Sequence, residues 1–170
     1  MTVNYKDTAV SKVRNFLWDQ LVANDLLDPQ DYLADGFTDL LVPVIPAQQV
    51  PEFNNLISGK TYIVYDFDIA GYGEEFWICE ENVLFSIFST SYQQVVELTN
   101  FMVDLFRRMD ESAKDVNLGL LSTDIFKFFY ITINSASSPT PMTEEGGNYM
   151  GQVDITYKYS RHLDTNKRFV

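Results

Sequence analysis

Apolar residues recur at steps of three and four near the start of the chain, within KDTAVSKVRNFLWDQLVAND. This spacing places them on one face of a helix. They are Val10, Val13, Leu17 and Leu21. Asp7 or Thr8 can accept hydrogen bonds from the first helical turn. The pattern stops at Asp28-Pro29, because the residue before a proline avoids helical dihedral angles. We therefore predict an amphipathic helix in this segment.

A second helical pattern begins near residue 91. Ser91 followed by Gln94 has the spacing of a capping box. The apolar stripe comprises Val95, Leu98, Met102, Leu105 and Met109, widened by Phe101 and Phe106. Arg107 and Arg108 follow at the C-terminal end, where positive charge favours the helix dipole. We expect this helix to lie across a sheet.

Four stretches have the β-branched and aromatic residues typical of strands. KTYIVYDFDI is followed by the turn sequence AGYG, and EEFWICEENVLFSIFST forms one strand or two. If unbroken, it places Trp77, Cys79, Val83, Phe85 and Ile87 on one face, whereas a bulge near residues 80–82 turns its second half over. IFKFFYITI is nearly all apolar, which indicates a central strand. YMGQVDITYKY alternates, which predicts one buried face and one wet face.

Between the first helix and these strands, LLVPVIPAQQVPEF contains three prolines. Each removes a ladder donor, so an edge strand or an extended crossover fits the segment. The fold class predicted is α+β: one domain over residues 1–170, with a mostly antiparallel sheet of four or five strands. Two main helices pack on one face of this sheet. Residues 1–6 and 162–170 are expected to be flexible tails.

The last two strands are separated by SASSPTPMTEEGG, from Ser135 to Gly147. Hairpin loops usually have two to five residues, so this segment is unusually long. The residues in it that could contact a partner are Pro139, Pro141, Met142, Glu144 and Glu145. Prolines stiffen such a segment and methionine suits adaptable contacts. Either the segment is an unordered hairpin tip, or it is an arm that a neighbouring subunit orders.

Composition supports a packed core, since 46% of the residues are apolar and 15% are aromatic. The net charge of −12 disfavours general nucleic-acid binding, because phosphate is repelled. The last 13 residues hold four basic residues and one acidic residue, a charge of +3 that leaves −15 for the remainder. Arg161, Lys167 and Arg168 are therefore candidates for contact with an acidic surface, the alternative being a solvated terminus.

Candidate chemistry is sparse, and we predict no catalytic, cofactor or metal site. His162 lies in the predicted tail, so a nucleophile triad lacks a placed base. Cys79 reads as a buried structural thiol. Asp66 and Asp68 have partial calcium-loop spacing, but Ala70 and Trp77 stand where oxygen ligands are needed. The adjacent carboxylates Glu74-Glu75, Glu80-Glu81 and Glu144-Glu145 are interpreted as solvated charges. No apolar run reaches a membrane span, and the start lacks a signal segment, so we expect a soluble protein made in a cytoplasm.

The order of these elements resembles the tail terminator proteins of long-tailed bacteriophages, including the sheath-stabilising terminators of contractile tails. The stretches that carry the resemblance are IPAQQVPEF, YIVYDFD, EEFWICEE and YMGQVDITYKYSR, within residues 40–161. It implies a structural virion protein, not an enzyme, that assembles in the host bacterial cytoplasm. Such proteins form a ring, commonly a hexamer, that caps the tail tube, contacts a sheath where there is one, and meets the head connector.

The same resemblance gives the 135–147 segment a role in subunit contacts. DNA would pass through the ring without specific binding, since acidic walls repel it. Two alternatives stay open. One is a neck, head–tail connector or tail-completion protein. The other is a small carbohydrate- or ligand-binding module, which a groove lined by Tyr62, Tyr65, Tyr72 or Trp77 would favour.

Overall fold

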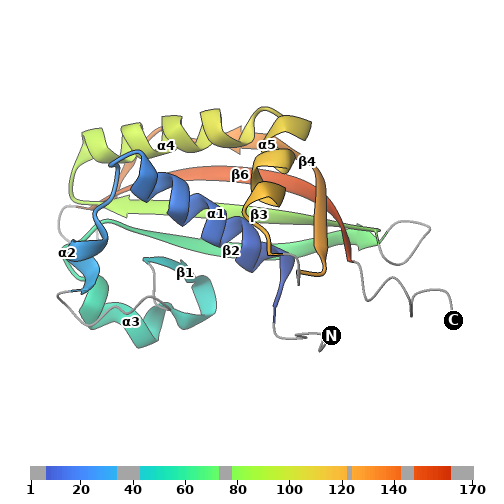
Figure 1. The fold of residues 1–170 in the computed structure, drawn as a ribbon. Helices are drawn as coiled ribbons and strands as arrows, with labels where there is room; N and C mark the ends of the chain where they lie inside the picture. Colours follow the sequence, from blue (N-terminus) through green and yellow to red (C-terminus); the bar gives the residue numbers. More distant parts are fainter. Residues whose placement is uncertain (1–6, 34–42, 73–77, 122–123, 143–147, 162–170) are drawn as a thin grey trace, which may run out of the picture.

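The computed structural model describes residues 7–33, 43–72, 78–121, 124–142 and 148–161. Within them the chain forms one α+β domain (Figure 1). The helices are α1 (Ala9–Ala23), α2 (Pro29–Leu33), α3 (Val50–Ile57), α4 (Tyr92–Phe106) and α5 (Asp110–Leu118), with a 3-10 turn η1 (Ala47–Gln49). The strands are β1 (Val44–Pro46), β2 (Tyr62–Tyr72), β3 (Ile78–Ser89), β4 (Phe126–Ala136), β5 (Thr140–Met142) and β6 (Asn148–Arg161).

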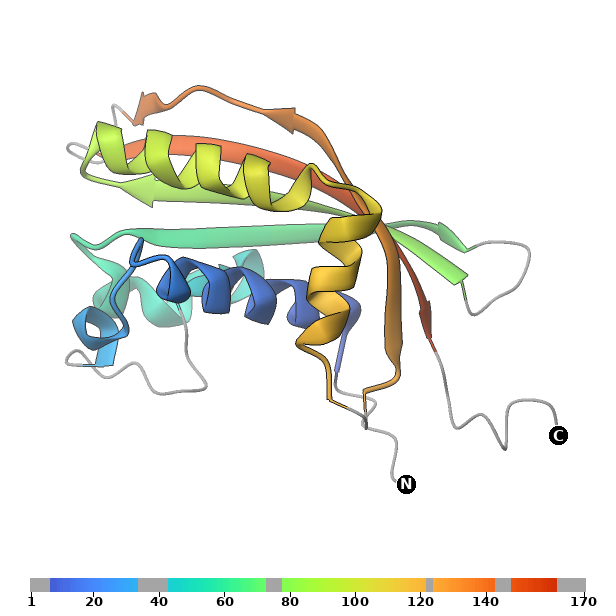
Figure 2. The same cartoon turned by 45° about the horizontal axis from the view of Figure 1, so that its top comes forward.

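The six described strands form one sheet in the order β1-β2-β3-β6-β4, with β5 also paired to β6. Only the β1–β2 pair is parallel, so the predicted α+β class with a mostly antiparallel sheet is confirmed. α1, α4 and α5 lie on the same face of the sheet (Figures 1 and 2). We call the opposite side of β2, β3, β6 and β4 the helix-free face.

Both predicted amphipathic helices form. The α1 stripe is buried, and Thr8 caps the helix in a capping box with Ser11. Ser91 caps α4 and accepts a hydrogen bond from the Gln94 amide. Met109 departs from the predicted α4 stripe, because it is 54% exposed at a left-handed turn with φ 49°. α4 ends at Phe106, three residues before Met109, and α5, a helix that was not predicted, begins at Asp110.

β3 runs without a bulge from Ile78 to Ser89, and its side chains alternate regularly between buried and half-buried. The segment predicted to form one strand or two therefore forms a single strand over Ile78–Ser89. The helix-covered side of β3 holds Cys79, Glu81, Val83, Phe85, Ile87 and Ser89. The alternation predicted for β6 is likewise found, with Val153, Ile155, Tyr157 and Tyr159 buried. β6 lies between β3 and β4 and is the central strand.

β4 was predicted to be central, and that prediction is wrong: it lies at the end of the strand order. Its apolar residues differ in burial. Phe128 and Ile131 are buried under the helices, while Phe129 is 39% exposed beside a register shift between Phe128 and Tyr130. The proline-rich segment forms the expected edge strand only over β1, and Pro51 starts α3, where its missing N–H costs nothing.

α4 approaches β6 most closely above Gly151. A Cβ built there would lie 2.8 Å from both Thr99 Oγ1 and Val95 Cγ1. Only glycine fits such a separation without a shift of the helix. α4 therefore packs tightly on β6 at Gly151, a contact that the alternation of side chains along β6 does not predict.

Candidate interaction surfaces

Part of the segment predicted as a long hairpin loop is strand. β4 extends through Ala136, the Ser137 amide donates to the Gln152 carbonyl at 2.8 Å, and β5 then pairs with β6. Residues 143–147 alone join Met142 to its partner Asn148, which is an ordinary hairpin length. The length that made the segment unusual comes from a strand that breaks and pairs again.

The predicted contact residues in this segment have different positions. Pro141 is exposed on β5 opposite Tyr149, whereas Pro139 and Met142 are half-buried. Glu144 and Glu145 lie outside the described residues. We call β5 with the facing residues 148–150 the hairpin end of β6.

The basic candidate Arg161 lies at the other end of β6, opposite Phe126. Its guanidinium carbon lies 5.9 Å from the centre of the Phe126 ring. Arg161 is twelve positions after Tyr149 along β6, which corresponds to about 40 Å of strand. Lys167 and Arg168 lie outside the described residues. Among the described candidates, the structure therefore places Pro141 and Met142 at one end of β6 and Arg161 at the other.

The outer edge of β4 is partly closed by side-chain and loop contacts. The Asn117 side chain donates to the Phe128 carbonyl at 2.9 Å and accepts from the Phe128 amide at 2.8 Å. Further along, the Ile131 amide donates to the Met109 carbonyl at 3.2 Å. Asn117 thus provides the two hydrogen bonds that a neighbouring strand would make there.

The remainder of this edge is blunted by sequence. Pro139 and Pro141 have no amide donor, and a register shift lies between Ile133 and Ser135. On the opposite edge, β1 has three residues, one of them Pro46. Short edge strands, prolines and bulges all resist the addition of a further strand. Contacts through side chains are therefore favoured over strand addition at both edges.

The helix-free face carries a polar cluster that crosses three strands. The Asn134 amide group donates to Asn82 Oδ1 at 2.8 Å, to Thr156 Oγ1 at 2.7 Å and to Asp154 Oδ1 at 3.3 Å. Thr156 also donates to Asn82 at 3.0 Å. Asp66 and Asp68 are exposed on the same face. They lie on strand β2, which confirms their interpretation as solvated carboxylates.

Aromatic side chains of β2, β3 and α4 lie beside the hairpin end of β6. Tyr62 stacks on Phe88 on the helix-free face, with ring centroids 5.0 Å apart. On the helix-covered face, Tyr92 meets Tyr149 edge-on at 5.6 Å, and Tyr92 is 51% exposed. Exposed aromatics are enriched among residues that anchor protein interfaces.

Glu81 was read from the sequence as a solvated charge, and that reading is wrong because the side chain is buried on the helix-covered side of β3. Glu81 is 5% exposed and accepts hydrogen bonds from the Tyr157 and Tyr159 hydroxyls, both at 2.5 Å. Burial, together with the Glu81 carboxylate, raises the pKa of both phenols. Burial also raises the pKa of the neighbouring Cys79 thiol, as expected for a structural cysteine. Glu81 shares the parity of Cys79 and Val83, so the alternation of β3 was the available signal.

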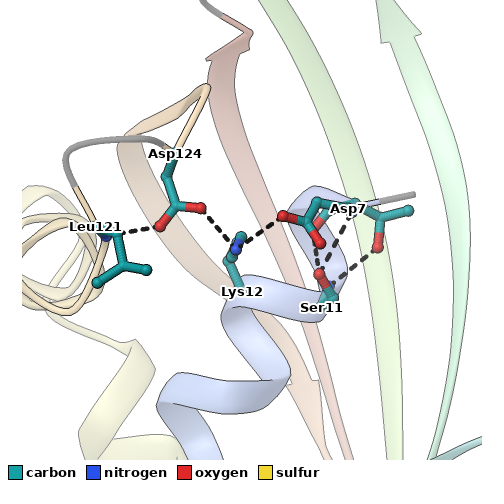
Figure 3. Close-up of polar contacts among 6 residues, drawn as sticks. Asp7, Ser11, Lys12, Leu121 and Asp124 are labelled. Carbon is teal, nitrogen blue, oxygen red and sulfur yellow. Dashed lines mark hydrogen bonds and ion pairs between the residues drawn. The ribbon is translucent and has the colours of Figure 1, made fainter. Parts of the chain in front are cut away.

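The helix-covered side also contains a cleft of about 610 Å³ between α1 and α5, with Leu105 from α4 in its wall. Lys12 lines it and lies 2.7 Å from Asp124 and 3.3 Å from Asp7 (Figure 3). Asp124 also accepts a hydrogen bond from the Leu121 amide at 2.6 Å. Burial lowers the pKa of Lys12, but the bonds and charges of the two aspartates outweigh it and raise the pKa above its ordinary value.

The rest of this α1–α5 cleft combines apolar surface with one uncompensated charge. Phe16 is half-buried in its wall, while Leu118 and Leu121 are 83% and 71% exposed. Arg108 pairs with Asp115 at 2.7 Å. Among the described residues no cation pairs with Asp19, and burial raises the pKa of its carboxyl.

Of the aromatics named for a ligand-binding groove, the two that the structure describes, Tyr62 and Tyr65, do not line this cleft. Tyr65 is buried in the core and Tyr62 is stacked on Phe88. The side chains of Tyr72 and Trp77 lie outside the described part. Over the described ranges, no group of three or more His, Cys, Asp or Glu residues is placed to hold a metal ion. In the same ranges, no helix has both the length and the apolarity to cross a membrane.

Comparison with protein-family models and with curated proteins finds no match to this chain.

Proposed function

We propose that the protein is a tail terminator of a long-tailed bacteriophage, a structural virion protein that assembles in the host cytoplasm into a ring, commonly a hexamer. The ring caps the tail tube, contacts the sheath of a contractile tail and presents a surface to the head connector. The observation that carries this proposal is the separation of two candidate contact sites to opposite ends of β6.

A protomer with different contact sites at its two ends favours head-to-tail association. Such heterologous contacts close into rings when the rotation between subunits permits. At the hairpin end of β6, Pro141 is exposed, and the exposed Tyr92 of α4 lies against Tyr149. In sequence, β5 is followed by the acidic Glu144-Glu145 pair. The other end leads from Arg161 into Lys167 and Arg168. Opposite charges at the two ends give these contacts a direction.

The blunted edges define the type of contact. With β1 short and the β4 edge occupied by Asn117 and interrupted by prolines, a neighbour docks against side chains and does not add a strand. Open-ended strand addition would produce fibres, whereas side-chain docking fixes the angle between subunits. The net charge of −12 is compatible with a ring through which DNA passes without being held.

The test replaces residues 143–147 by Asn-Gly. Because Met142 pairs with Asn148, a two-residue turn closes the hairpin and keeps β5 on the sheet. We expect an unchanged free energy of unfolding but loss of ring assembly, measured by mass photometry and electron microscopy with purified tail tubes. Deletion of residues 137–145 is a poorer test, since it removes β5 as well.

A matched control carries Asp66→Asn and Asp68→Asn on the helix-free face, away from both ends of β6. Assembly by the shortened hairpin at the wild-type level would contradict the role of the hairpin end. Binding to filled heads, with none to tail tubes, would reassign the protein to the neck.

A further inference from the structure

The α1–α5 cleft exposes apolar side chains to solvent and contains one carboxylate that no described cation pairs with. Its apolar surface at Leu118 and Leu121 faces solvent, and its other charges are paired within the wall. Asp19 is the exception among the described residues: the residue is exposed, burial desolvates its carboxyl only in part, and no cation pairs with it. A fitting occupant therefore supplies both apolar side chains and a positive charge.

The chain itself contains such a segment. Residues 162–170 read HLDTNKRFV, with adjacent cations at Lys167 and Arg168 followed by apolar Phe169 and Val170. This is the order of groups that a cleft with one free carboxylate and an apolar wall would bind. In residues 1–6 the one basic side chain is that of Lys6, and Asp7, which follows it in sequence, pairs with Lys12.

The position at which the segment begins also fits. Arg161 pairs with Phe126, and Asp124, two residues before Phe126, forms an ion pair with Lys12 in the wall of the cleft. The Arg161 guanidinium lies over the Phe126 ring, whose side chain belongs to the helix-covered core. Nine extended residues reach about 30 Å, whereas α5 is about 14 Å long. The segment can therefore reach along the whole cleft of its own chain.

We infer that the α1–α5 cleft is the docking site for residues 162–170 of the same chain, with Lys167 or Arg168 paired to Asp19 and Phe169 or Val170 against the apolar wall. The docked segment withholds its positive charges from a neighbouring subunit until it leaves the cleft. The docking itself occurs within one subunit and is tested without the ring; under the proposed function, the segment leaves the cleft before Lys167 and Arg168 contact a neighbour.

The test uses the chain ending at Arg161 and a fluorescent peptide HLDTNKRFV. We expect the peptide to bind the truncated chain and to bind the full chain at least tenfold more weakly, because the full chain fills its own cleft. Asp19→Asn in the truncated chain should weaken binding about fivefold, the range of a single exposed ion pair. Asp66→Asn, on the opposite face of the sheet, is the matched control and should change nothing.

A second readout uses the intact protein. Trypsin should cleave after Lys167 and Arg168 more slowly in the full chain than in its Asp19→Asn variant, at a rate independent of protein concentration. Equal peptide binding by full and truncated chains, no binding at all, or equal effects of Asp19→Asn and Asp66→Asn would overturn the inference. Protection that rises with protein concentration would also overturn it, since the cleft would then hold a second copy's segment. None of these results would exclude ring assembly.

Discussion

The buried carboxylate of Glu81 provides the sharpest test of the structure. Its two oxygens accept the Tyr157 and Tyr159 hydroxyls, one each, and all three side chains are at least 93% buried. Glu81→Ala removes both acceptors and leaves two phenolic O–H groups without partners in the core. A buried donor left unsatisfied costs about 1–3 kcal/mol, so the free energy of unfolding should fall by about 2–6 kcal/mol.

Glu80→Ala is the matched control, one residue away on the same strand. Glu80 faces the helix-free side, where it is half-buried and accepts one longer hydrogen bond, at 3.2 Å, from Tyr130. Its loss should cost no more than about 1 kcal/mol. Urea unfolding followed by circular dichroism gives both values, and unchanged m-values show that the unfolding transition is comparable.

A rescue experiment separates hydrogen bonding from cavity formation. Glu81→Leu combined with Tyr157→Phe and Tyr159→Phe removes the donors together with the acceptor. Replacing a buried polar network by apolar groups of similar shape is often close to neutral. The triple variant should therefore be more stable than Glu81→Ala alone. A Glu81→Ala loss below about 0.5 kcal/mol, or one equal to that of Glu80→Ala, would refute the burial of this side chain.

Three further predictions concern packing, the sheet edge and pH. Gly151→Ala should lower the free energy of unfolding by about 1–3 kcal/mol, because its Cβ would meet α4, and Val95→Ala should recover part of the loss in thermal melts. Asn117→Ala should leave the Phe128 backbone unpaired, cost about 1–3 kcal/mol and increase aggregation measured by light scattering. The pKa values of Lys12 and Tyr157 are raised by folding, so their stabilisation is complete below about pH 10 and lost as pH rises through the folded values. Chemical denaturation from pH 8 to 11 should show this fall, and a flat profile would contradict it.

Local periodicity was enough to predict the elements whose faces are set by burial against one neighbouring layer. The apolar stripe of α1, most of α4 and the alternation of β6 were read correctly, as was the α+β class. For α4 the prediction extended three residues too far, because Met109 continues the helical spacing yet takes a left-handed conformation. The spacing of apolar side chains does not indicate at which residue the backbone leaves the helical conformation.

The tertiary structure decided which strand is central, where the hairpin closes and which carboxylate is buried. The apolar β4 is an edge strand because α5 and Asn117 cover its outer side, a contact that no pattern within β4 reveals. Glu81 finds its donors 76 and 78 residues away in sequence. Periodicity is a property of one segment and its solvent, whereas strand order and buried pairs depend on which distant segments meet.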